Sequence, residues 1–169
     1  MSAEIKILEQ KISNPIKAWG KSLEEKSEKF SYNLNEKCIE ELTNNTDKLP
    51  NQNPNDFKIL NEFIHNLKEN VLIGGCGFFV INGKELSNFN SNQKKDINII
   101  ISKMIGQLLE QNKNHDLHVE IKDLGKSMKT GGRYHHTKEG GSYHTDGSHL
   151  YKNPPDYVGL LCINPAKKG

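Results

Sequence analysis

The sequence has few of the residues that would build a disulfide-rich protein. Its 169 residues include three cysteines, Cys38, Cys76 and Cys162, which lie far apart and form no Cys-x-x-Cys pair. An odd number of isolated cysteines argues against a disulfide framework and a zinc ribbon, and it is typical of reduced thiols inside a cell. We therefore expect a cytoplasmic location.

Long apolar runs and strong charge are also missing. No stretch reaches the roughly 18 apolar residues that a membrane span requires, and the charged segment 1–11 is unlike a secretory signal. The net charge is only +2, and the lysines are mixed with glutamates instead of forming a basic stripe. We therefore expect neither a membrane nor a nucleic acid as a partner.

Apolar residues make up only 34% of the chain, and the mean hydropathy is −0.73. The length still suffices for one domain with one core. We expect residues 1–32 to form an N-terminal arm and residues 33–169 to belong to a single domain. The only tryptophan, Trp19, lies in the arm, and its large apolar area favours docking onto the rest of its own domain. Stacking on a ligand is the alternative.

Apolar residues at helical spacing predict three helices. Asn33 or Asn35 is expected to cap the first helix. The second helix should cover about residues 56–69. Ser91 is expected to cap the third helix, whose apolar stripe continues to Leu109.

Three further stretches predict β-strands. Residues 71–81 are apolar around a glycine turn, residues 117–121 alternate between apolar and polar, and residues 157–163 are apolar throughout. A strand of the last kind is buried on both faces and needs neighbours, which the preceding segments hardly supply. The sequence therefore looks as if it stopped inside a sheet. The polar residues 43–55 are expected to form a mobile loop.

The segment 142–151, with the sequence SYHTDGSHLY, places an imidazole and a carboxylate two residues apart. In an extended chain His144 and Asp146 would point to the same side. Such a pair can fill two positions of the two-histidine, one-carboxylate triad that holds Fe(II). A His-x-Asp pair alone is not specific. His135 and His136 are further candidates, of which at most one could bind, because neighbours in an extended chain point to opposite sides.

The order of these features along the chain adds to the motif. The features are the arm with Trp19, the helix near residues 56–69, the strand at residues 77–83, the long amphipathic helix, and the segments 143–148 and 154–162. This order resembles the taurine dioxygenase/TfdA-like branch of the Fe(II)- and 2-oxoglutarate-dependent oxygenases. The resemblance covers nearly all of this chain, but only about the first half of such a domain.

The resemblance implies an α+β fold with a double-stranded β-helix (jelly-roll) core and flanking helices, incomplete at the C-terminus. It implies Fe(II) and 2-oxoglutarate as cofactors and oxidation of a small-molecule substrate, with release of succinate and CO2. His144 and Asp146 match the first two iron ligands of the family. The second histidine and the arginine for 2-oxoglutarate would lie beyond Gly169. Arg133 and Tyr143 are candidate substrate contacts, with structural roles as the alternative.

Two other readings of the sequence remain open. The chain could be a truncated or split product without enzymatic activity, folding only in part or with a partner. It could also be a cupin-like domain that binds a metal without redox chemistry. An unpaired apolar strand would promote self-association in either case.

Overall fold

The computed structural model describes residues 13–14, 16–112, 114–132, 136–138, 144, 146 and 154–165. The chain divides into two compact units, Met1–Ile105 and Gly106–Gly169, here called unit 1 and unit 2. Each unit is described by itself. The described residues combine helices with a small sheet, which agrees with the expected mixed α and β composition. None of the helices in these described ranges is long and apolar enough to cross a membrane.

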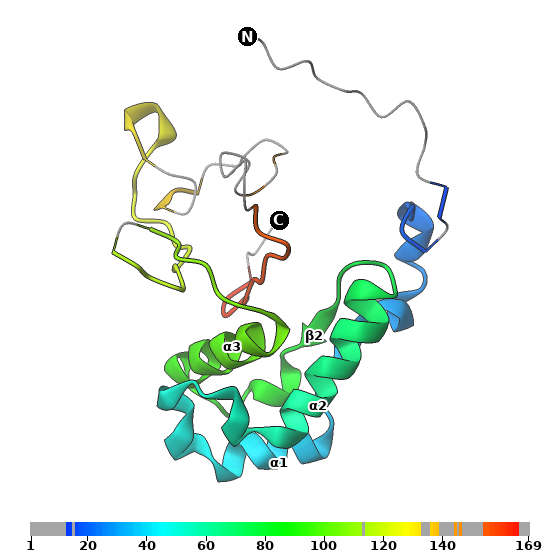
Figure 1. Cartoon of the computed structure of the whole chain (residues 1–169). Helices are drawn as coiled ribbons and strands as arrows, with labels where there is room; N and C mark the ends of the chain where they lie inside the picture. Colours follow the sequence, from blue (N-terminus) through cyan, green and yellow to red (C-terminus); the bar gives the residue numbers. More distant parts are fainter. Residues whose placement is uncertain are drawn as a thin grey trace. The chain divides into compact units, whose positions relative to one another are not determined.

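The described residues of unit 1 form three α-helices and a two-stranded parallel sheet (Figure 1). The helices are α1 (Glu36–Asn44), α2 (Lys58–Leu67) and α3 (Ser91–Ile105). The strands are β1 (Ser31–Asn33) and β2 (Val80–Asn82), with Tyr32 opposite Ile81. The 3-10 turns of unit 1 are Lys21–Leu23, Ser27–Lys29, Thr46–Asn51, Pro54–Asp56 and Lys84–Leu86.

The first predicted helix is confirmed, and the structure decides its cap. The side chain of Asn35 accepts a hydrogen bond from the backbone N–H of Cys38 at 2.9 Å, while Asn33 lies in β1. Cys38 and Leu42 are fully buried, as expected for the inner edge of α1. The polar cap at Asn35 and the buried edge formed by Cys38 and Leu42 therefore define where α1 begins.

The third predicted helix is confirmed, but both of its predicted ends were wrong. Asn90 caps α3, because its Oδ1 accepts the backbone N–H groups of Asn92 and Gln93 at 3.0 Å each. Gln93 Oε1 accepts the N–H of Asn90 in return at 2.9 Å, which completes a reciprocal capping box. The helix ends at Ile105, directly before Gly106, whose backbone freedom disfavours helix. Leu109 lies outside the helix and is exposed.

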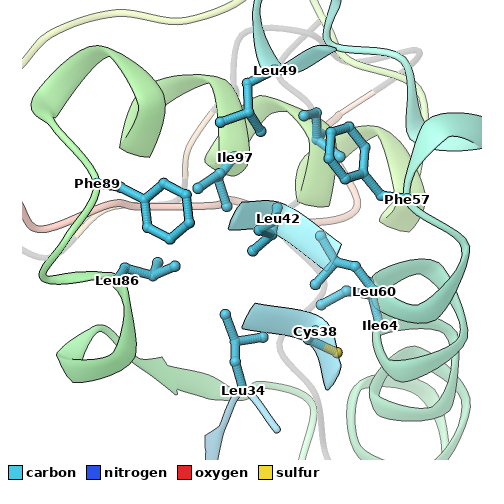
Figure 2. Packing of buried hydrophobic residues seen from close by; sticks show 11 residues of the cluster. Leu34, Cys38, Leu42, Leu49, Phe57, Leu60, Ile64, Leu86, Phe89 and Ile97 are labelled. Atoms are coloured by element: carbon cyan, nitrogen blue, oxygen red, sulfur yellow. The ribbon is translucent and has the colours of Figure 1, made fainter. Parts of the chain in front are cut away.

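The core of unit 1 lies among the three helices and the segment that joins α1 to α2 (Figure 2). Its buried side chains are Leu34, Cys38, Leu42, Leu49, Phe57, Leu60, Ile64, Leu86, Phe89, Ile97 and Ile100. Burying an apolar side chain of this size contributes about 1.5–3 kcal/mol to stability. The apolar stripes predicted for the second and third helices therefore face this core.

The expectation of a mobile loop at residues 43–55 was wrong. This segment forms the 3-10 turns Thr46–Asn51 and Pro54–Asp56, and Leu49 within it is fully buried. Gln52 holds the segment against α3: its Nε2 donates to Asp96 Oδ1 at 2.8 Å, and its carbonyl accepts from Lys103 Nζ at 3.0 Å. One buried leucine and two side-chain hydrogen bonds outweigh the polar composition.

The strand predicted at residues 71–81 is only partly correct. Residues Lys68–Ile73 instead continue α2 as a π-helical turn, and only Val80–Asn82 is a strand. The glycine turn between them is confirmed, and its shape requires glycine. A Cβ on Gly75 would lie 2.7 Å from the carbonyl oxygen of Val71, and Gly77 has a φ of +91°.

The arm of unit 1 docks onto this glycine turn, as Trp19 led us to expect. Lys17 Nζ donates to the carbonyl oxygen of Ile73 at 2.6 Å, and Trp19 Nε1 donates to that of Cys76 at 2.7 Å. The ring of Trp19 also contacts Phe78, with the ring centroids 5.2 Å apart. The carbonyl of Ile73 ends the helical segment and that of Cys76 lies in the glycine turn, so these two donors satisfy groups that would otherwise need water.

Unit 2 has little regular structure in its described part. The 3-10 turn Met128–Thr130 is the regular element there. Residues 117–121 form no strand, and Leu117 and Ile121 are exposed, so this strand prediction was wrong. Residues 157–163 form no strand either, and Leu160 is 79% exposed instead of buried. Strands need hydrogen-bonding neighbours, and the described residues supply none to these segments.

Candidate metal centre

The two predicted iron ligands lie together in unit 2. His144 Nε2 is 3.0 Å from Asp146 Oδ1. Both side chains are exposed, His144 to 60% and Asp146 to 53%. The two side chains thus lie close together, with Asp146 in a turn rather than in a strand. Each is also accessible to a solute.

The separation of the two donor atoms fits a metal site. Adjacent ligands of an octahedral ion with metal–ligand bonds of about 2.1 Å lie about 3.0 Å apart, because they span an edge of the octahedron. Imidazole nitrogen and carboxylate oxygen are the donor types of the Fe(II) facial triad. The pair therefore suits two adjacent positions on one ion. A direct hydrogen bond between the two side chains has the same length.

The other predicted site residues contribute no further contacts to this description. Arg133, Tyr143 and His135 lie outside the described residues. His136 is half-buried, and its carbonyl oxygen accepts the backbone N–H of Leu124 at 3.0 Å, which closes the loop between them. No group of three or more histidine, cysteine, aspartate or glutamate side chains that could hold a metal occurs among the described residues. The described part of the centre is thus a two-ligand pair.

A second pairing of histidine with carboxylate occurs elsewhere in unit 2. His115 Nδ1 lies 2.7 Å from Glu110 Oε2, and both side chains are exposed. These residues are five apart, and in the same segment Asn112 Nδ2 lies 2.7 Å from Asp116 Oδ2. His115 has a φ of +64°, so a turn and not an extended chain brings its partner close. The pair provides an internal comparison for the site at His144.

Sequence reasoning missed two hollows in unit 1. The larger, of about 580 Å³, is lined by the apolar Leu34 and Ile39 and by the carboxylates of Glu36, Glu40 and Glu85. The smaller, of about 420 Å³, lies beside Trp19. The spacing of Glu36 and Glu40 shows that they share a face of α1, but only the tertiary structure brings Glu85 to that face.

Comparison with known proteins adds no relative to this description. No protein-family model, no curated protein and no solved structure matches the chain.

Proposed function

We propose that this chain carries the first two iron ligands of an Fe(II)- and 2-oxoglutarate-dependent oxygenase that acts on a small molecule in the cytoplasm. His144 and Asp146 are these ligands. The observation that carries the proposal is the 3.0 Å separation of His144 Nε2 and Asp146 Oδ1, which matches adjacent ligand positions on one ion. The order of motifs along the sequence supports the same family.

The two ligands have distinct tasks in this proposal. Nε2 is the ring nitrogen of His144 that faces Asp146, so in this proposal Nε2 binds the ion. Asp146 supplies a negative charge that offsets part of the charge of the ion. Bound Fe(II) supplies the oxidising chemistry with dioxygen and 2-oxoglutarate, which becomes succinate and CO2.

The remaining parts of the site are also proposals. A second histidine and an arginine for 2-oxoglutarate complete the site in the family that the sequence resembles, and we place them on polypeptide beyond residue 169. Arg133 and Tyr143, near the ligands in sequence, are proposed to contact a polar or anionic substrate. In this proposal the helices of unit 1 flank a jelly-roll core.

A metal titration tests the ligand assignment. The full chain is titrated with Fe(II) without oxygen, and binding is measured by calorimetry. We expect His144→Ala and Asp146→Ala each to weaken binding at least tenfold, because each removes one of two protein donors. His115→Ala is the matched control, since it removes an exposed histidine from the comparable pair with Glu110. Equal binding by the wild type and the double variant His144→Ala/Asp146→Ala would refute the assignment.

Turnover separates the oxygenase from a metal-binding module without redox chemistry. The module is the second candidate, because the pair of His144 and Asp146 could bind a metal without redox chemistry. Succinate release is measured on a longer polypeptide that includes the missing ligand and arginine. Release that depends on His144 and Asp146 supports the oxygenase. Metal binding without release supports the module.

A further inference from the structure

A hollow in unit 1 has the composition of a small-molecule site. It has a volume of about 420 Å³ and is lined by Trp19, Gly20, Lys21, Leu23, Glu24, Phe30 and Phe78. This volume falls in the range of small-ligand pockets, about 300–1,000 Å³. Aromatic and aliphatic side chains make up most of the lining. One lysine and one glutamate are the charged residues that line it.

The aromatic wall is built from three rings in contact. Phe78 lies between the other two, with its centroid 5.2 Å from that of Trp19 and 5.1 Å from that of Phe30. The ring of Phe78 is tilted by 57° to that of Trp19 and by 34° to that of Phe30. Contacts of this kind suit a flat aromatic guest, which gains offset or edge-to-face packing.

Trp19 offers this guest an apolar surface. Its one polar group, the indole N–H, already donates to the carbonyl oxygen of Cys76 at 2.7 Å. The side chain is nevertheless 49% exposed. The exposed area of Trp19 is therefore suited to an apolar or aromatic group rather than to a hydrogen-bond acceptor.

Lys21 and Glu24 are the two charged residues that line the hollow. Lys21 begins the 3-10 turn Lys21–Leu23, and Glu24 ends it, with its backbone N–H bound to the carbonyl oxygen of Lys21 at 3.0 Å. Side chains three residues apart in a 3-10 helix are aligned, about 6 Å apart along the axis. Within the described ranges neither side chain forms an ion pair. A positive and a negative group therefore both face solvent beside the aromatic wall.

We propose that this hollow binds a free aromatic amino acid in its zwitterionic form. The ring packs against Trp19 and Phe78, the carboxylate faces Lys21, and the ammonium group faces Glu24. An aromatic amino acid carries both charges on one carbon next to its ring, which matches the arrangement of wall and edge. The proposal concerns unit 1 alone and is independent of the metal centre in unit 2.

The fluorescence of Trp19, the only tryptophan, reports occupancy directly. The full chain is titrated with L-phenylalanine, phenethylamine, 3-phenylpropionate and L-alanine. We expect L-phenylalanine to give a saturable change at millimolar concentration. Each analogue that lacks one charge should bind roughly two- to fivefold more weakly, the value of an exposed ion pair. L-Alanine, which lacks the ring, should give no saturable change.

Two variants test the assignment of the charges. In Lys21→Gln the preference for L-phenylalanine over phenethylamine should disappear, because the carboxylate has lost its partner. In Glu24→Gln the preference over 3-phenylpropionate should disappear for the matching reason. Lys26→Gln and Glu28→Gln change exposed charges that do not line the hollow and should keep both preferences. Circular dichroism checks that each variant is folded.

Three results would overturn the proposal. The first is no saturable fluorescence change with L-phenylalanine at millimolar concentration. The second is equal affinity for L-phenylalanine and both single-charge analogues in the wild type. The third is the same loss of preference in the control variants as in Lys21→Gln and Glu24→Gln.

Discussion

Glu41 caps a helix to which it does not belong. Its Oε2 accepts the backbone N–H of Leu60 at 2.9 Å, and its Oε1 accepts that of Ile59 at 3.0 Å. These are the second and third N–H groups of α2, which a side chain at the preceding N-cap normally satisfies. Phe57 occupies that N-cap and offers no acceptor. A carboxylate from α1 therefore both satisfies the start of α2 and complements its dipole.

Removing this cap should destabilise unit 1. We expect Glu41→Ala to lower the free energy of unfolding by about 1–2 kcal/mol, because one exposed and one part-buried N–H group lose a charged acceptor. Urea denaturation followed by circular dichroism measures the change. Glu40→Ala, an exposed neighbour on the same helix, is the control and should change stability by less than about 0.5 kcal/mol. Equal effects of the two substitutions would disprove the capping role.

Cys38 should make the protein less stable at alkaline pH. Burial raises the pKa of the Cys38 thiol above its ordinary value of 9.0, and the nearby charge of Glu41 raises the pKa further. Above about pH 9 the unfolded chain loses this proton while the folded protein keeps it, so the unfolding free energy falls as pH rises. Below that pH the contribution is fully present.

Denaturation at a series of pH values checks this expectation. The decline from pH 9 upward should be shallower in Cys38→Ala than in the wild type. Burial also raises the pKa of Tyr32 above 10.0, which adds a decline at higher pH that the Cys38 variant keeps. Identical slopes for both proteins between pH 9 and pH 10 would show that Cys38 is not the group responsible.

Gly75 should tolerate no side chain. An added Cβ would lie 2.7 Å from the carbonyl oxygen of Val71 and 2.9 Å from that of Asn70, and backbone atoms cannot easily move away. We expect Gly75→Ala to cost about 1–3 kcal/mol of unfolding free energy. At Gly83 an added Cβ would meet nothing within 4 Å, and φ is −87°. Gly83→Ala should therefore be neutral or slightly stabilising by thermal denaturation.

The apolar segment near Leu160 should drive self-association. Tyr157, Val158 and Leu160 are 46%, 57% and 79% exposed, and they pair with no strand in the described part of the chain. An apolar edge of this kind pairs readily with another copy. We expect the chain to elute as an oligomer in size-exclusion chromatography, and Leu160→Lys to shift it toward the monomer.

A control separates this segment from general surface hydrophobicity. Leu109→Lys replaces another exposed leucine, 42% exposed, and should leave the elution volume unchanged. A wild-type chain that elutes as a monomer at all concentrations would contradict the expected association. So would an equal shift in the two variants.

The helices were largely predictable from the sequence because their hydrogen bonds are local. The apolar stripe of α2 and the cap of α1 by Asn35 follow from residues three or four apart. The errors at the helix ends also have local causes. Asn90 and Gln93 form a capping box, so Asn90 and not the predicted Ser91 is the N-cap of α3. Gly106 directly follows the last residue of the helix.

Two of the three predicted strands are not formed, and the third is formed only in part. The reason is that a strand depends on a partner that local sequence does not reveal. Residues 117–121 and 157–163 have strand composition, yet neither finds a neighbour among the described residues of the chain. Residues 71–73 are helical because the π-helical turn that continues α2 includes them. Apolar composition alone cannot distinguish a buried strand from the end of a helix.

For the candidate sites too, the sequence decided some features and the tertiary structure decided others. The sequence singled out His144 and Asp146 by their two-residue spacing, but their 3.0 Å approach involves a turn at Asp146 that the spacing did not predict. The sequence also determined that Trp19 would seek an apolar partner. Only the tertiary structure decided that the partner is Phe78, 59 residues away, and that Lys21 and Glu24 stand beside the rings. Contacts so distant in sequence depend on how the whole chain packs, which no local pattern records.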